Sequence, residues 1–226
     1  GGREHALAWR PAGEAGVEAV VAVPGSAGIA TVAGVVIEPA VGATNPAAVV
    51  AAAGRAGGDL AVVGPEAPLA AGVADSLGAA GIPVFGPIAA AARIEASKAF
   101  CHEVAAAAGI PMARARAFAS LAPARAFAAE LAAAGDGVVV KADGLAAGKG
   151  VAVCDGLAEA EAALAAIFAG GEEPAGPPRV VVEQRLRGPE ASVIALCDGR
   201  DALALPAARD HKRLLDGDAG PNTGGM

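Results

Sequence analysis

The stretch VVVKADGLAAGKGVAVC, residues 138–154, decides how we expect this chain to fold. It contains two β-branched runs, Val138–Val140 and Val151–Val153, separated by a loop rich in Gly and Ala. Such a pattern predicts two strands that carry a glycine-rich flap between them.

The chemistry of this loop depends on its glycines and lysines. Glycine has no Cβ, so backbone N–H groups can approach an anion closely, and lysine supplies the positive charge. A Walker loop would need G-x-x-x-x-G-K-[ST] opening a helix, whereas here the Gly-Lys pair runs on into an expected strand. We therefore predict a polyphosphate-gripping flap; an ordinary hairpin with two solvated lysines fits this segment alone equally well. The residues concerned are Lys141, Gly144, Gly148, Lys149 and Gly150.

Composition narrows the class of protein. The 226 residues, 54% hydrophobic and 18% charged, fit a soluble globular protein of one large or two to three small domains. A net charge of −7 without a basic cluster argues against a nucleic-acid partner. No apolar run is long enough to cross a bilayer, and no signal peptide opens the chain. Three widely spaced cysteines indicate a reducing compartment, so we expect a cytoplasmic protein with no membrane partner.

Both ends of the sequence suggest an incomplete chain. Residue 1 is not Met, and GGREH (1–5) reads as a phosphate-approach turn that enters a helix with no strand before it. A frayed terminus is the alternative interpretation of these glycines. Residues 220–226 form a Gly-rich loop that leads to no further element.

Residues 1–88 show strand–helix alternation with short loops, which predicts a parallel α/β sheet. Ligands of such sheets bind at the carboxyl ends of the strands, where Glu66 lies; a helix-start carboxylate favoured by the helix dipole is the alternative. Asn45-Pro46 supplies an N-cap and an N1 proline for one helix. The expected strands are 17–23, 35–37, 60–63 and 83–85, and the expected helices 3–10, 46–54 and 68–80.

The remainder of the chain predicts further helices and strands around the flap. We expect one long helix over 89–108 that carries Lys98, the only lysine in the first 140 residues. Ser120 and Asp155 are expected to cap the helices that follow them, the first with one apolar face and the second over 157–169. A Gly/Pro-rich hinge is expected over 170–178. The expected apolar face is Ala124, Phe127, Ala128 and Leu131, and the expected strands are 180–183 and a pair, 192–196 and 202–205, around Asp198-Gly199.

The order of these features resembles the ATP-grasp ligases and, more closely, the glycinamide ribonucleotide synthetase family. The matching stretches are GGREHALAW (1–9), VGPEAPL (63–69), SKAF (97–100), VVKADGLAAGKGV (139–151), EQRLRGPEAS (183–192) and DHKRLLDGDAGPNTGGM (210–226). The resemblance implies an α/β protein with a Rossmann-like parallel-sheet domain followed by an ATP-grasp fold. The implied parts are a substrate domain (1–88), a connecting helix (89–110), a small lobe with the flap (111–178) and the start of the large lobe (179–226).

The resemblance also implies a role for individual residues. ATP phosphates would contact Lys98 and Lys141 beneath the flap residues Asp143, Gly144, Gly148, Lys149 and Gly150. Adenine and ribose would contact Glu183, the backbone of Leu186, and Glu190. The first domain would present Gly2, Arg3, Glu4 and Glu66 to 5-phosphoribosylamine. Asp210 and Lys212 would act in catalysis, with Pro221, Asn222, Thr223, Gly224 and Gly225 holding substrates near the γ-phosphate.

The implied reaction joins glycine to 5-phosphoribosylamine with ATP, through a glycyl phosphate, in a monomeric enzyme. Its Mg²⁺ or Mn²⁺ ligands are expected beyond residue 226, with no metal site in this chain. We therefore expect the 226-residue chain to bind ATP weakly and without turnover. One alternative is a non-catalytic nucleotide-binding protein that lacks the metal site. Another is a different carboxylate–amine ligase of the superfamily, which should lack DHKR and GPNTGGM.

Overall fold

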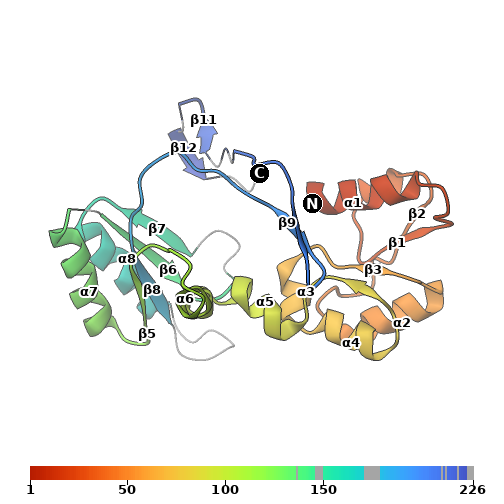
Figure 1. Ribbon diagram of the computed structural model, residues 1–226, viewed down its shortest axis with the longest axis horizontal. Helices are drawn as coiled ribbons and strands as arrows, with labels where there is room; N and C mark the ends of the chain where they lie inside the picture. Colours follow the sequence, from red (N-terminus) through yellow and green to blue (C-terminus); the bar gives the residue numbers. More distant parts are fainter. Residues whose placement is uncertain are drawn as a thin grey trace. The chain divides into compact units, whose positions relative to one another are not determined.

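The computed structural model describes residues 1–135, 137–145, 150–170, 179–209, 211, 213–217 and 219–222. The chain divides into two compact units (Figure 1). The first comprises Gly1–Met112 together with the short segment Asp143–Leu145, and the second comprises Ala113–Ala142 and Ala146–Met226. The finer four-part division expected from the sequence stays a prediction.

The strands of the first unit form two parallel ladders. β1 (Val20–Ala22) pairs with β2 (Val35–Ile37), and β3 (Ala61–Val62) pairs with β4 (Val84–Phe85). Parallel pairing is therefore confirmed, although the described strands form two separate two-stranded sheets rather than one. β2 has the predicted bounds, whereas β1, β3 and β4 are shorter than the apolar runs that predicted them.

Helices surround these ladders. α1 contacts both strands of the first ladder, while α2 packs on α4 and α3 packs on α5 (Figure 1). The expected cap of α2 is confirmed, since Asn45 Oδ1 accepts a hydrogen bond from the Ala48 N–H at 3.1 Å and Pro46 opens the helix. The helical elements are α1 (Gly2–Ala12), η1 (Ile29–Thr31), α2 (Pro46–Ala56), α3 (Glu66–Ala70), α4 (Val73–Ala79), α5 (Ala89–Ala96) and α6 (Lys98–Ala107).

Two long helices predicted in this unit are wrong, because each is interrupted. The expected helix over 68–80 is split into α3 and α4 by Gly72, whose φ of 82° belongs to the left-handed region. The expected helix over 89–108 is split into α5 and α6 by Ser97, whose backbone is extended (φ −137°, ψ 113°). The Ser97 hydroxyl accepts a hydrogen bond from the Phe100 N–H at 3.2 Å, which makes Ser97 the N-cap of α6.

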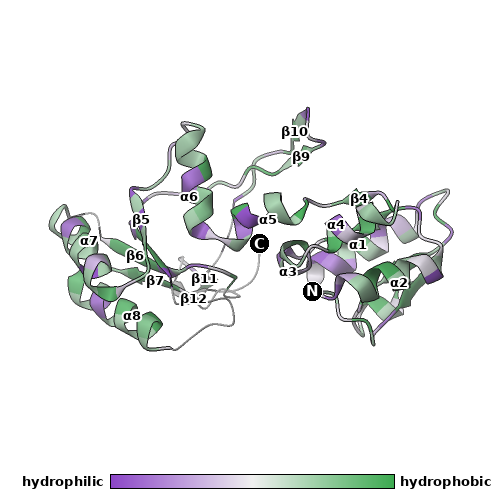
Figure 2. Ribbon diagram, turned by 90° about the horizontal axis from the view of Figure 1, so that it is seen from below, coloured by the Kyte–Doolittle hydropathy of each residue, from purple (hydrophilic) through white to green (hydrophobic). Residues whose placement is uncertain are grey.

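The second unit is built on one antiparallel sheet with the strand order β5-β8-β6-β7. The expected pair of strands around the flap is confirmed, with Val138 opposite Cys154. Helices α7 and α8 pack on each other and on the sheet, and both layers are largely hydrophobic (Figures 1 and 2). These elements are β5 (Ala115–Phe118), α7 (Leu121–Ala133), β6 (Val138–Ala142), β7 (Val151–Cys154), α8 (Leu157–Ala169) and β8 (Val180–Gln184).

The pleat of β6 and β8 assigns their side chains to two faces. One face lies in the core under the helices, and the alternate residues point to the opposite face. The predicted apolar face of α7 is confirmed, because all four of its residues are buried in this core. The core residues are Ala124, Phe127, Ala128, Leu131, Val138, Val140, Cys154, Ala160, Leu164, Val180 and Val182.

Two predicted caps differ from the structure. Ser120 is the N-cap of α7, but its side chain makes no capping hydrogen bond. Gly156, not Asp155, is the N-cap of α8. The Asp155 carboxylate instead pairs with the Arg185 guanidinium, a stronger partner for an anion than a single N–H group.

The chain after β8 forms two antiparallel hairpins. β9 (Ala195–Cys197) pairs with β10 (Ala202–Ala204) around the expected turn, and β11 (Arg213–Leu215) pairs with β12 (Ala219–Asn222). The first strand begins later than predicted, because Ser192 forms only an isolated bridge with Ala208. Most of the expected hinge, residues 171–178, lies outside the described residues. Within the described part, no helix is long and apolar enough to cross a membrane.

We predict that Gly25→Ala lowers the free energy of unfolding by about 2 kcal/mol, because Gly25 has a left-handed φ of 80° and an added Cβ would meet the Ile37 side chain. The matched control is Gly54→Ala in helix α2, where a Cβ meets nothing within 4 Å. That substitution should stabilise the chain slightly through helix propensity. Urea unfolding of both variants tests this, and equal unfolding midpoints would contradict it.

Candidate functional site

Among the ion pairs that the structure describes in the second unit, the pair of Lys141 and Glu183 is the most buried. The antiparallel register sets Lys141 opposite Val181 and Val139 opposite Glu183, so these side chains share the sheet face that points away from α7 and α8. Lys141 Nζ lies 2.5 Å from Glu183 Oε2, and Glu183 is only 6% exposed. This pair joins a carboxylate acceptor to an ammonium donor at the ends of two adjacent strands.

The segment after Glu183 is held from two sides. Gln184 donates its backbone N–H to the Arg114 carbonyl at 2.8 Å. On the other side, Arg185 pairs with the Asp155 carboxylate, and Arg187 Nη2 lies 3.7 Å from the same carboxylate. The sequence analysis did not identify these ion pairs. The available signal was an aspartate directly after β7, Asp155, together with the two arginines on either side of Leu186.

Leu186 and Glu190 lie in the chain that follows β8. Leu186 is 69% exposed, and Glu190 is exposed as well. Their neighbour Arg185 is fixed, since its backbone N–H also donates to the Gly137 carbonyl at 3.3 Å. The strand end therefore offers an ordered acceptor, Glu183, followed by an open stretch of backbone that a flat ring could approach.

In the first unit, Lys98 belongs to a cluster around the start of α6. Its Nζ donates to the Gly144 carbonyl at 2.8 Å. The Asp143 carboxylate accepts from the Ser97 hydroxyl at 3.1 and 3.2 Å and from the Ala99 N–H at 3.2 Å. Sequence reasoning singled out Lys98, Asp143 and Gly144 but missed Ser97; a serine directly before the lysine, a residue type that favours N-caps, was the available signal.

The base of the predicted flap closes through the backbone. The Ala142 N–H donates to the Gly150 carbonyl at 2.7 Å, which continues the β6–β7 pairing by one step. Gly148 and Lys149, two of the predicted ATP contacts, lie outside the described residues.

The predicted substrate residues of the first unit meet at the start of α1. Gly2 is the first residue of that helix, and Arg3 Nε lies 2.7 Å from Glu4 Oε1. Arg3 Nη2 lies 3.8 Å from Glu66 Oε2, so one guanidinium contacts both carboxylates. Glu66 is the first residue of α3, which agrees with the alternative interpretation of Glu66 as a helix-start carboxylate. The Arg3 guanidinium, which donates a hydrogen bond to the Glu4 carboxylate, holds the pKa of Glu4 well below its usual range.

The last part of the predicted site is described only in its backbone. Pro221 and Asn222 belong to β12, and nothing is described of their side chains. Asp210, Lys212, Thr223, Gly224 and Gly225 lie outside the described residues. Among the residues that the structure describes, no group of three His, Cys, Asp or Glu side chains could hold a metal ion.

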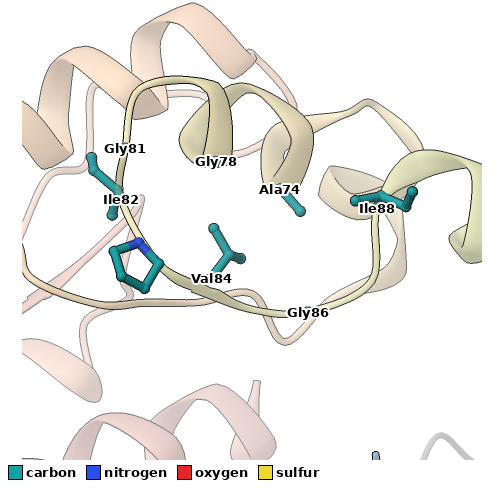
Figure 3. A pocket seen from close by; sticks show the side chains of 8 residues that line it. Ala74, Gly78, Gly81, Ile82, Val84, Gly86 and Ile88 are labelled. Carbon is teal, nitrogen blue, oxygen red and sulfur yellow. The ribbon is translucent and has the colours of Figure 1, made fainter. Parts of the chain in front are cut away.

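An open hollow of about 420 Å³ in the first unit is not part of this constellation (Figure 3). Its walls come from α4, β4 and the turns beside them, and they carry no titratable side chain. Such a lining offers no charge to a phosphate or a carboxylate. The lining residues are Ala74, Gly78, Gly81, Ile82, Pro83, Val84, Gly86 and Ile88.

Comparison with known families and curated proteins covers the whole chain. The family model described as "Phosphoribosylglycinamide synthetase, N domain" matches residues 1–95, and "Phosphoribosylglycinamide synthetase, ATP-grasp (A) domain" matches residues 96–226. The phosphoribosylamine–glycine ligase of Allochromatium vinosum is 49% identical over all of this chain and 52% of its own length. That of Streptomyces coelicolor is 52% identical over all of this chain and 50% of its own length. The chain thus spans about half the length of these relatives.

Solved structures give the same result for the fold. The phosphoribosylamine–glycine ligase of Thermotoga maritima matches with a TM-score of 0.73 and 30% identity, over all of this chain and 52% of its own. A biotin carboxylase domain from Hydrogenobacter thermophilus matches with a TM-score of 0.69 over 93% of this chain and 48% of its own. At 19% identity the second match concerns the fold alone. The α/β class with an ATP-grasp fold expected from the sequence is confirmed.

We predict that Lys141→Met lowers the free energy of unfolding by about 1–3 kcal/mol, because it removes the Lys141 ammonium from the buried Glu183 carboxylate. The double variant Lys141→Met/Glu183→Gln should recover part of that loss, since no buried charge remains.

The matched control for this pair is Arg55→Met, which breaks the exposed Arg55–Glu38 pair at 3.3 Å and should cost less than about 1 kcal/mol. Denaturant unfolding of all three variants tests the prediction. It would be contradicted by equal losses for Lys141→Met and Arg55→Met.

We predict that the stability lost in Glu4→Gln depends on pH. The folded-state pKa of Glu4 is lowered to about 2, so its ionised form stabilises the fold. That contribution is fully present above the unfolded-state pKa, near 4.3, and is lost as the pH falls toward 2. Urea unfolding at pH 7, 5.5, 4 and 3 should show a constant difference between the two proteins at pH 7 and 5.5 and a smaller one below. A difference that already falls between pH 7 and 5.5 would refute this assignment.

Proposed function

Because the chain belongs to the phosphoribosylglycinamide synthetase family, we propose that the protein is an ATP-dependent ligase that joins glycine to 5-phosphoribosylamine. The products are glycinamide ribonucleotide, ADP and phosphate, a step of purine biosynthesis. The observation that carries this proposal is the identity of 49–52% over the whole chain to curated phosphoribosylamine–glycine ligases.

The adenine end of ATP is assigned to the end of β8. An amino group on the ring needs an acceptor, and the Glu183 carboxylate lies there in a buried position. Beyond it, the exposed Leu186 backbone can meet the ring edge, and Glu190 can accept from the ribose hydroxyls. The anchors of Arg185 on Asp155 and Gly137 support this assignment, since a pre-ordered site loses less conformational entropy on binding.

The phosphate end is assigned to Lys98, Lys141 and the glycine-rich segment. An ammonium group has three N–H donors. Lys141 pairs with Glu183, and Lys98 donates to the Gly144 carbonyl, so each lysine keeps donors for phosphate oxygens. Charge neutralisation and positioning supply most of the catalysis of phosphoryl transfer, which suits lysines held in fixed places. Gly148, Lys149 and Gly150 complete the proposed contacts.

The remaining substrates are assigned to two groups of residues. Gly2, Arg3, Glu4 and Glu66 combine a helix start, a guanidinium and two carboxylates, which suits the phosphate and hydroxyl groups of 5-phosphoribosylamine. Asp210, Lys212 and residues 221–225 are proposed to hold substrates near the γ-phosphate.

A divalent metal, Mg²⁺ or Mn²⁺, would neutralise phosphate charge during phosphoryl transfer, with protein ligands outside the described residues. Glycine would be activated as glycyl phosphate, and exclusion of water by the flap would protect this mixed anhydride from hydrolysis. Three free cysteines, one of them the exposed Cys197, support a reducing, cytoplasmic location. We further propose that the enzyme is a monomer.

The test is glycine-dependent ADP release by the gene product that contains this chain. We expect ADP only when ATP, glycine and 5-phosphoribosylamine are all present, and glycinamide ribonucleotide in equal amount. Lys98→Met and Lys141→Met should each lower kcat/KM by on the order of 10²-fold, because each removes a charge from the phosphates.

The control for these variants is Arg125→Met, which removes an exposed cation from α7 and should leave kcat/KM unchanged. ATP binding without any ADP release would instead support the non-catalytic nucleotide-binding protein. ADP release that does not depend on glycine would overturn the ligase assignment.

A further inference from the structure

We propose that Asp143 is a positioning residue that acts on ATP only through Lys98, rather than a direct ligand of ATP. The proposal rests on the function proposed above, because it concerns the lysine assigned there to the phosphates. It is carried by the hydrogen bonds that Asp143 and Gly144 make with the start of α6.

The oxygens of Asp143 are already engaged within the protein. The Ser97 hydroxyl contacts both of them, at 3.1 and 3.2 Å, and the Ala99 N–H donates to Oδ1 at 3.2 Å. Ala99 is 3% exposed, so its N–H cannot turn to bulk water if the carboxylate leaves. Asp143 therefore serves as a carboxylate cap from a distant part of the chain, at the helix end where the dipole favours an anion.

A carboxylate is also a poor ligand for a triphosphate. Both groups are anionic, and two negative charges at hydrogen-bond distance repel each other. The α6 N-terminus that would otherwise attract a phosphate is occupied by Asp143 itself. The negative charge of Asp143 therefore stabilises the start of α6.

Gly144 connects this cap to Lys98. It directly follows Asp143, and its carbonyl accepts from Lys98 Nζ at 2.8 Å. Its φ of 113° lies in the region that residues other than glycine rarely adopt. Fixing Asp143 therefore fixes the Gly144 carbonyl, and that carbonyl orients the ammonium group.

This orientation has a thermodynamic consequence for ATP. A free lysine side chain loses rotamer entropy when it is immobilised. Lys98 already loses part of that freedom to Gly144 while two of its three N–H donors remain for phosphate oxygens. Without the Asp143 cap, Lys98 would lose this rotamer entropy only when ATP binds, and the affinity for ATP would be lower.

Asp75 provides a matched control in the same unit. Its Oδ2 accepts from the Ala89 N–H at 2.8 Å, so it caps the start of α5 from a distance, as Asp143 caps α6. No residue proposed to bind ATP lies on α5. Asp75→Ala should therefore lower stability as Asp143→Ala does, without any change in the affinity for ATP.

The experiment is a double-mutant cycle on the gene product that contains this chain, with the Kd for Mg-ATP measured by calorimetry. The four proteins are the wild type, Asp143→Ala, Lys98→Met and the double variant. We expect Asp143→Ala to weaken ATP binding roughly tenfold when Lys98 is present and less than about twofold when Met replaces it. A residue that only supports folding would not show this dependence on Lys98.

Two further measurements test whether the effect on ATP binding comes from the hydrogen bond between Asp143 and the Ala99 N–H. Amide hydrogen exchange at Ala99 should speed up in Asp143→Ala, and Asp143→Asn, which keeps the acceptor, should retain most of the slow exchange. We expect Asp143→Asn to fold with the cap in place, because it keeps the acceptor, so it serves as the test variant if Asp143→Ala does not fold. It should weaken ATP binding less than Asp143→Ala does.

The outcomes are distinguishable. Additive losses of affinity in the cycle would show that Asp143 contacts ATP independently of Lys98, which overturns this inference and leaves the proposed function standing. Wild-type affinity in Asp143→Ala and Asp143→Asn would overturn it as well. A wild-type protein that binds no ATP would overturn the proposed function and this inference together.

Discussion

The antiparallel pairing of β6 with β8 is the constraint on which the second unit depends. Its register buries Val138, Val140, Val180 and Val182 under α7 and α8. Because side chains alternate along a strand, the same register sets Lys141 and Glu183 on the other face. A shift of either strand by one residue would turn that strand's other face toward the helices and bring Lys141 or Glu183 into the core. The hydrophobic core therefore specifies the position of the ion pair.

Helix capping gives the first unit a comparable order. Ser97 ends α5 and starts α6 within one residue, which places Lys98 at the very start of a helix instead of in its middle. The break removes backbone hydrogen bonds that a continuous helix would make. The freed N–H groups of Phe100 and Ala99 donate instead to the side chains of Ser97 and Asp143. The lysine that we propose to contact ATP and its supporting groups thus derive from one interruption of regular structure.

The fold class could be predicted because it depends on local patterns. The β-branched runs at 138–140 and 180–182, the glycines between them and the apolar spacing of α7 each indicate their own element. The family resemblance also depended on short sequence stretches, and the family comparison confirmed it. The helix breaks at Gly72 and Ser97 were not predictable in the same way, since Ala-rich sequence on both sides favours a continuous helix.

The sequence by itself determined the chemistry available to this protein: the lysines, the strand-end glutamate and the glycine-rich segment. Only the tertiary structure decided which of these groups meet. Lys141 and Glu183 are 42 positions apart, and Ser97 and Asp143 are 46 positions apart, so no local pattern could pair them. Strand register joins the first pair, and a helix end that needs an acceptor joins the second. Both are consequences of packing, because burial leaves a polar group only the partners that the fold provides.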